Sequence, residues 1–238
     1  MRPVLRFVNV GTSLLSSVLR AGSGRSVGPL GDRPEQPLIL YDFEGCPFCR
    51  KVREALSMLD LDAEIRPCPK NGPRFREEVK RRGGRLSFPY LVDPHTGSEM
   101  YESDDIVRYL YSRYGQGEIP RWLSGGVMTN FSSALANLPR PARGVFYRPA
   151  RQPAQALELW SFEASPFCRI VRESLTTLEL PYRLHNVAKG SRQRQAFVAR
   201  SGKLQVPYLV DPNEGVALFE SAAIVGFLEE TYRLSGAH

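Results

Sequence analysis

Short apolar runs alternate along the chain with longer stretches in which apolar residues recur at helical spacing. The first run, residues 38–43, is bounded by Pro37 and Gly45, as is typical of a buried strand. Pro47 follows, and proline fits the first turn of a helix because its missing N–H group has no partner to lose there. The apolar positions beyond it lie about one helical turn apart, at Val52, Leu56 and Leu59. The pattern therefore predicts a strand that leads directly into a helix.

The same alternation continues beyond this helix. It predicts a strand over 63–66, a charged helix over 73–82, strands over 90–92 and 98–101, and a last helix that opens at Ser103. Gly83-Gly84 ends the charged helix. Ser103 is expected to cap the last helix, with Asp104 and Asp105 in its first turn. The order β-α-β-α-β-β-α implies a mixed α/β sheet with helices on both faces.

Much of this pattern occurs twice. Three landmarks recur in the same order: residues 40–50 at 159–169, residues 89–94 at 207–212, and Glu102-Ser103 at Glu220-Ser221. Landmarks that repeat in one order at nearly constant spacing indicate an internal duplication. The copies differ at one important atom, because Cys46 of the first copy is replaced by Ser165 in the second.

The length of 238 residues leaves room for two units that each bury a core. The duplication predicts a leading helix with a linker, a first unit, a connector with a helix, and a second unit, over residues 1–37, 38–115, 116–156 and 157–234. No apolar run reaches the roughly 18 residues of a membrane-spanning helix, so no membrane span is expected. The net charge of +7 is spread along the chain. We therefore interpret the basic residues as a solvated surface and expect no nucleic-acid partner.

The N-terminal segment allows two interpretations. Residues 1–31 contain arginines and serines but no acidic residue, which resembles an organelle transit peptide. However, Leu15–Leu19 is echoed by Phe131–Leu135 in the connector, which also lacks acidic residues and cannot be a cleaved address. The segment is therefore better explained as a short helix that belongs to the repeat. We expect a cytoplasmic location, with an organelle stroma or matrix as the alternative.

The cysteines favour redox chemistry over a metal site or a disulfide scaffold. Four cysteines are too few for a disulfide-stapled secreted domain. A structural zinc ion needs about four ligands, commonly in two close pairs. The chain has one C-x-x-C pair, and its three histidines stand isolated, so no metal is expected. A C-x-x-C pair beside a strand–helix pattern indicates a thiol redox motif.

Cys46 is the expected nucleophile and Cys49 the expected resolving thiol. The thiolate is the reactive form of cysteine, and a helix N-terminus lowers the pKa of a thiol because its free N–H groups and its dipole favour the anion. Arg50 and Lys51 are expected to add positive potential one turn along. Cys49 lies one helical turn after Cys46, close enough to resolve a mixed disulfide.

These motifs resemble two known groups of proteins. Cys46-Pro47-Phe48-Cys49 after the first strand is similar to glutaredoxins, and Pro89 with Glu102-Ser103 is similar to the N-terminal domain of glutathione transferases. As a whole, the chain resembles proteins with two tandem thioredoxin-like domains of this kind. The resemblance implies glutathione as co-substrate, and it implies that the all-helical C-terminal domain of transferases is missing here.

The resemblance also assigns binding residues. Pro89 matches a cis-proline whose preceding residue, Phe88, offers backbone hydrogen bonds to the cysteinyl part of glutathione. Glu102 and Ser103 match the pair that binds the γ-glutamyl end. The second unit carries the corresponding residues Val206, Pro207, Glu220 and Ser221. The glycyl carboxylate has four basic candidates, Arg74, Arg76, Lys80 and Arg85.

Three functions remain open from the sequence. The first is a glutathione-linked thiol–disulfide oxidoreductase that acts on disulfides or glutathionylated proteins. The second is a glutathione transferase or isomerase, in which Ser165 would hydrogen-bond the glutathione thiolate. The third is a non-catalytic module that binds glutathione or a protein, in which the second unit is a decayed copy kept for packing. Cys168 is expected to be a buried small hydrophobe. Cys68 follows the second predicted strand on a proline-flanked loop and is expected to be incidental, with an exposed thiol available for regulatory disulfides as the alternative.

Overall fold

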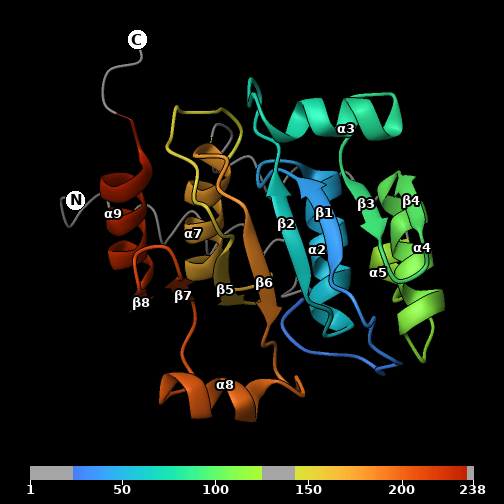
Figure 1. Ribbon diagram of the computed structural model, residues 1–238. Helices are drawn as coiled ribbons and strands as arrows, with labels where there is room; N and C mark the ends of the chain where they lie inside the picture. The colour runs from blue at the N-terminus through green and yellow to red at the C-terminus, as the bar shows by residue number, and fades with distance from the viewer. Residues whose placement is uncertain (1–23, 125–142, 235–238) are drawn as a thin grey trace.

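The computed structural model describes residues 24–124 and 143–234. Within these residues the first unit consists of β1 (Leu38–Asp42), α2 (Pro47–Met58), β2 (Ala63–Pro67), α3 (Phe75–Gly83), β3 (Tyr90–Asp93), β4 (Ser98–Tyr101) and α4 (Ser103–Tyr114) (Figure 1). The second unit repeats this order with β5 (Leu157–Ser161), α7 (Pro166–Thr177), β6 (Tyr182–Asn186), α8 (Arg194–Ser201), β7 (Tyr208–Asp211), β8 (Val216–Phe219) and α9 (Ser221–Tyr232). A short helix, α5 (Arg121–Ser124), lies at the start of the connector.

The two units share one eight-stranded sheet with the order β4-β3-β1-β2-β6-β5-β7-β8. In each unit the first strand runs parallel to the second and antiparallel to the third. The units join where β2 pairs antiparallel with β6, with Ala63 opposite Leu184 and Ile65 opposite Tyr182. Leu184 is the repeat equivalent of Ile65, and Tyr182 that of Ala63, so the junction is symmetric about an approximate twofold axis. The joining covers two strand edges that would otherwise be open to other chains.

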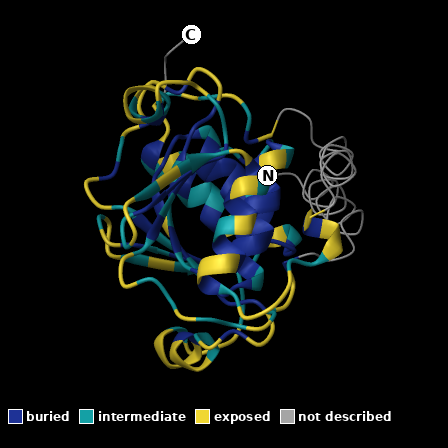
Figure 2. Cartoon of the chain, turned by 90° about the vertical axis from the view of Figure 1, so that its right-hand side faces the viewer, coloured by how far each residue is buried: buried dark blue, intermediate teal, exposed yellow. Residues whose placement is uncertain are grey.

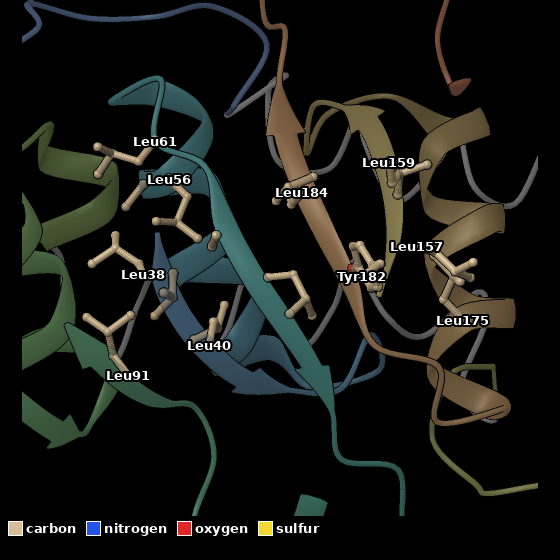
Figure 3. Packing of buried hydrophobic residues seen from close by; sticks show 14 of the residues in the cluster. Leu38, Leu40, Leu56, Leu61, Leu91, Leu157, Leu159, Leu175, Tyr182 and Leu184 are labelled. Atoms are coloured by element: carbon tan, nitrogen blue, oxygen red, sulfur yellow. The ribbon is translucent and has the colours of Figure 1, made fainter. Parts of the chain in front are cut away.

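The side chains of the sheet alternate between two faces, as the pleat requires. Leu40 and Leu91 belong to a large core that contains α2 and α4 and continues through the second unit (Figure 3). Tyr41 and Tyr90 point to the other face, where they pack with Phe75 of α3. Buried residues gather in the sheet and in α2, where Cys49 to Ser57 are buried on all sides, while exposed residues lie on loops and on outer helices such as α8 (Figure 2). The predicted mixed sheet with helices on both faces is therefore present.

The stretch before each unit packs against the other unit. The Val27 N–H donates to the carbonyl of Lys189 at 2.9 Å, at the end of β6. In the matching position, the Tyr147 N–H donates to the carbonyl of Lys70 at 3.0 Å, just beyond the end of β2. The leading segment and the connector thus belong to the duplicated pattern. The helices expected around 15–19 and 131–135 lie outside the described residues.

Candidate active site

Cys46 lies at the start of α2. It is the N-cap residue, with an extended backbone (φ −84°, ψ 122°), and its Sγ accepts a hydrogen bond from the Cys49 backbone N–H at 3.3 Å. Pro47 occupies the first helical turn, as the sequence predicts. Only 4% of Cys46 is exposed, and Cys49 is 0% exposed. The sulfur is therefore at the expected helix start, but it lies beneath packed side chains, which the sequence did not indicate.

The two thiols of this pair differ in acidity. Burial alone would raise the pKa of Cys46, but hydrogen bonds from the Cys49 thiol and from the backbone N–H groups of Cys49 and Phe48, together with the charge of Arg53, outweigh it and lower that pKa. Burial and the hydrogen bond to Cys46 raise the pKa of Cys49 well above its ordinary value. The proton of the pair therefore stays on Cys49, and Cys46 is the thiol that ionises first.

The cation beside Cys46 differs from the ones expected from the sequence. Arg50 pairs with Glu54 at 3.2 Å, and Lys51 pairs with Asp104. Arg53 is the residue whose charge lowers the pKa of Cys46. Its guanidinium, 1% exposed, donates to the Asp42 carboxylate at the end of β1. The sequence did not indicate the role of Arg53, because a buried arginine and a solvated arginine give the same pattern along an amphipathic helix.

The cis-proline predicted by the resemblance is present beside this helix. The Phe88–Pro89 peptide bond is cis. Tyr90, the next residue, lies opposite Tyr41 of β1 in the antiparallel register, so Pro89 lies close to the end of β1 from which the Cys46 loop departs. The Phe88 ring packs edge-on against Phe43 of that loop, with ring centroids 6.1 Å apart. The sheet thus brings Phe88 and Pro89 to the Cys46 end of the fold.

The Glu102-Ser103 pair lies at the same end, with one correction. Tyr101 lies opposite Tyr90, so the residues that follow it stand beside Pro89. The N-cap of α4 is Glu102, whose φ is +66°, and Ser103 is the first helical residue rather than the cap. Glu102 makes no side-chain capping bond, and its exposed carboxylate pairs with Arg85 at 2.9 Å. Ser103 is 5% exposed.

The four basic candidates for the glycyl carboxylate lie in different places. Arg76 lies over the Phe88 ring, 4.9 Å from its centroid, and donates to the Cys68 carbonyl at 3.1 Å. Arg74 bonds Gln152 of the connector, and Arg85 pairs with Glu102. Lys80 is exposed on α3. The contact with Phe88 makes Arg76 the candidate next to the cis-proline.

The second unit reproduces this geometry without the leading sulfur. Ser165 is the N-cap of α7, and its Oγ accepts a hydrogen bond from the Cys168 N–H at 3.3 Å. The Val206–Pro207 bond is cis, and Glu220 precedes α9 with a φ of +68°. The Gln205 amide donates to the Glu220 carboxylate, and Ser221 is 8% exposed. Ser165 therefore replaces Cys46 as a helix cap but not as a redox group.

Other predicted features lie outside the site. Cys68 is fully buried behind β2, and burial raises its pKa well above the ordinary value, so it is not an exposed thiol. Hollows of about 280 Å³ and about 220 Å³ flank the junction of the units, beside Arg66 and His185 respectively. Over residues 24–124 and 143–234, no cluster of three metal-ligating side chains is found, and no helix is long and apolar enough to cross a membrane.

Two comparisons with known proteins found a match. The family model of the glutathione S-transferase N-terminal domain matches two separate stretches, residues 40–118 and 159–236, one for each unit. A solved glutathione transferase of Bombyx mori is similar over part of the chain, with 27% identity and a TM-score of 0.33. That match covers 39% of this chain and 45% of the transferase, so this chain matches less than half the length of its relative. Comparison with the curated proteins gave no match.

The two family matches together cover well over half of the chain, and each spans one β-α-β-α-β-β-α unit. The predicted fold class, two tandem thioredoxin-like units, is confirmed. The chain therefore belongs to the family of the glutathione S-transferase N-terminal domain, and it contains two copies of this glutathione-related unit.

Proposed function

We propose that this chain is a glutathione-linked thiol–disulfide oxidoreductase in which Cys46 attacks and Cys49 resolves. The observation that carries the proposal is the Cys46 sulfur at the N-cap of α2, where it accepts the Cys49 N–H. The opposite pKa directions of the two thiols support the same roles, because the attacking sulfur must be a thiolate while its neighbour keeps the proton.

The chemistry is an exchange of disulfides. The Cys46 thiolate attacks the glutathione sulfur of a glutathionylated protein, forms a Cys46–glutathione disulfide, and releases the protein thiolate, which takes up a proton. A second glutathione then attacks this adduct, restores the Cys46 thiolate and leaves as glutathione disulfide. Alternatively, Cys49 loses its proton and attacks Cys46, which releases reduced glutathione and leaves a Cys46–Cys49 disulfide. In the first branch the second glutathione supplies the electrons. In the second branch the Cys46 and Cys49 thiols supply them, and two further glutathione molecules then reduce the Cys46–Cys49 disulfide and leave as glutathione disulfide.

The residues around Cys46 are suited to hold glutathione. We assign the Phe88 backbone to the cysteinyl part, Glu102 and Ser103 to the γ-glutamyl end, and Arg76 to the glycyl carboxylate. Arg76 stands over the Phe88 ring and is partly exposed, so its remaining donors are available for a carboxylate. We expect no metal in this mechanism.

The burial of Cys46 constrains the substrate. With 4% of the residue exposed, the sulfur offers a narrow approach. A glutathione moiety that enters the site can present its own sulfur while the protein attached to it stays outside. A disulfide inside a folded protein cannot approach in the same way. The proposal therefore favours glutathionylated proteins and small disulfides as substrates.

The test is reduction of a glutathione mixed disulfide by the full chain, coupled to glutathione and its reductase. Cys46→Ser is expected to abolish the activity. Cys168→Ser, which removes the matching buried thiol of the second unit, is expected to retain it. Equal activity in the two variants, or no activity in the unmodified chain, would refute the proposed mechanism.

The same burial also favours a second candidate, a non-catalytic module that binds glutathione or a protein. In this case Cys46 would titrate near the ordinary value of about 8.5, and the chain would still be stabilised by glutathione. The transferase alternative predicts conjugation of glutathione to electrophiles, with loss of that activity in Ser165→Ala. The cytoplasmic location remains part of the proposal, with an organelle as the alternative.

A further inference from the structure

Four buried side chains form a closed ionic square between the units. Arg172 binds Glu44 with two nitrogens, Nε at 3.0 Å and Nη2 at 3.1 Å. Arg53 binds Glu163 at 3.1 Å in the reciprocal contact. Each arginine also reaches the other carboxylate, Arg53 to Glu44 at 3.1 Å and Arg172 to Glu163 at 2.9 Å. The four side chains are 1–2% exposed, so water screens these contacts very little.

This square encloses the loop that carries Cys46. Glu44 stands two residues before Cys46, and Arg53 stands on α2 after it, so the second unit holds a residue on each side of the sulfur. The residue between Glu44 and Cys46 is also held by the second repeat, because the Gly45 N–H donates to the carbonyl of Gly144 at 3.2 Å. Contacts from outside the first unit therefore hold the residues on both sides of Cys46.

The pattern of loss and retention in the second unit indicates what its contacts are for. Ser165 replaces the sulfur, and Ser161 replaces Asp42, the carboxylate that binds Arg53 beneath the Cys46 pair. Glu163 and Arg172 are retained, and these are the residues that reach into the first unit. Packing alone does not require them, since exchanging a buried ion pair for apolar side chains of similar volume is often neutral or stabilising.

We propose that Glu163 and Arg172 are positioning residues for the Cys46 site, so that the second unit acts as a built-in partner of the redox unit. The inference rests on the proposed function, because it describes how its nucleophile is placed. Glu163 restrains Arg53, the cation next to Cys46, and Arg172 neutralises Glu44, the anion next to Cys46. Removal of the Glu163 charge therefore stabilises the Cys46 thiolate, and removal of the Arg172 charge destabilises it.

The charged and titratable groups packed around the Cys46 loop come from five elements: Asp42 of β1, Glu44 of the loop, Cys49, Arg50, Arg53 and Glu54 of α2, Glu163 after β5, and Arg169, Arg172 and Glu173 of α7. Glu163→Gln removes a negative charge and leaves Arg53, which still binds Asp42 and Glu44, less neutralised. Arg172→Gln removes a positive charge and leaves Glu44 less neutralised. The first change favours the thiolate, and the second disfavours it.

The experiment is the pH dependence of Cys46 alkylation by iodoacetamide in the full chain, followed by mass spectrometry of the peptide that contains Cys46. The midpoint pH of alkylation is expected to fall in Glu163→Gln and to rise in Arg172→Gln. Each shift is expected to be at least about half a pH unit, which is about a threefold change in the proton affinity of Cys46. Glu173→Gln is the matched control, because Glu173 is buried in the same helix but pairs with Arg169 four residues earlier. Its midpoint is expected to move less than either.

The signs separate positioning from a merely structural role. Simple loosening of the fold would move both midpoints upward, toward the free thiol, and that result would overturn the inference, as would two unchanged midpoints. If Arg172→Gln does not fold, Glu44→Gln/Arg172→Gln removes both charges, and its midpoint is expected to return close to that of the unmodified chain. A midpoint raised in this pair as well would overturn the inference. A midpoint near the ordinary thiol pKa of about 8.5 in the unmodified chain would refute the proposed function itself. The alkylation curve of the unmodified chain alone shows this outcome.

Discussion

Helix α3 of the first unit is capped by the second unit, and this contact gives a quantitative prediction. The N-cap of α3, Arg74, makes no side-chain capping bond of its own. Instead, Oε1 of Glu179 accepts the backbone N–H groups of Arg74 at 3.2 Å and Phe75 at 3.1 Å. Loss of a helix cap costs about 0.5–2 kcal/mol, and bonds to a charged acceptor lie in the upper part of such ranges. We expect Glu179→Ala to destabilise the first turn of α3 by about 1.4 kcal/mol.

Hydrogen exchange of the full chain measures this effect locally. A loss of about 1.4 kcal/mol corresponds to about tenfold faster exchange, expected in the first turn of α3 and not in α8. The matched control is Asp60→Ala, because Asp60 is the repeat equivalent of Glu179 and accepts the Arg192 backbone N–H, two residues before the start of α8, at 3.0 Å. It should accelerate exchange at the start of α8 instead. Equal acceleration at both helices in both variants, or no acceleration at α3 in Glu179→Ala, would refute the reasoning.

Two further predictions concern the same interface. A Cβ atom at Gly45 would lie 2.3 Å from Cγ2 of Val145, so Gly45→Ala is expected to lower the free energy of unfolding by about 1–3 kcal/mol. Thermal denaturation should show that Gly45→Ala/Val145→Ala recovers part of this loss. A Gly45→Ala variant as stable as the unmodified chain would contradict the contact. Burial raises the pKa of the Glu179 carboxyl above 4.5, although this carboxyl accepts hydrogen bonds from the backbone N–H groups of Phe75 and Arg74. The folded state therefore binds the carboxyl proton more tightly than the unfolded state does. As the pH rises from 4.5 through the raised pKa, the folded state loses stability. The stability of the unmodified chain relative to Glu179→Gln should therefore fall over this range in urea titrations, and a constant or rising difference would contradict the raised pKa.

The order of strands and helices could be predicted because it depends on local patterns. The apolar run that becomes β1, the proline that opens α2, and the glycine that ends α3 act within a few residues of themselves. Because the sequence pattern occurs twice, each of these predictions also applied to the second unit. The position of Cys46 at a helix start followed from the same local signals. The cis bond before Pro89 followed from resemblance, because the residues alone allow either isomer.

Several features that the sequence did not predict depend on residues from the other repeat. The pairing of β2 with β6 joins strands more than a hundred residues apart, and no local pattern selects that edge. The start of α3 at Phe75, rather than at the predicted residue 73, coincides with the Glu179 cap. The buried arginines left one faint signal, since Val52-Arg53-Glu54 recurs as Val171-Arg172-Glu173. A repeat of charges can mark either a solvated surface or a shared ionic contact, and only the packing distinguishes them.

The symmetry of these contacts explains how one unit could lose its sulfur while the fold kept both units. Each unit provides the other with a carboxylate and an arginine, and Glu179 and Asp60 each accept backbone N–H groups at or just before a helix of the other unit, so deletion of either unit would leave these charges and N–H groups without their partners. The sulfur has no such reciprocal role, because a serine hydroxyl caps α7 through the same hydrogen bond that the thiol makes to α2. Replacement of the thiol by a hydroxyl in one unit therefore removes chemistry from that unit without removing any contact on which the other unit depends.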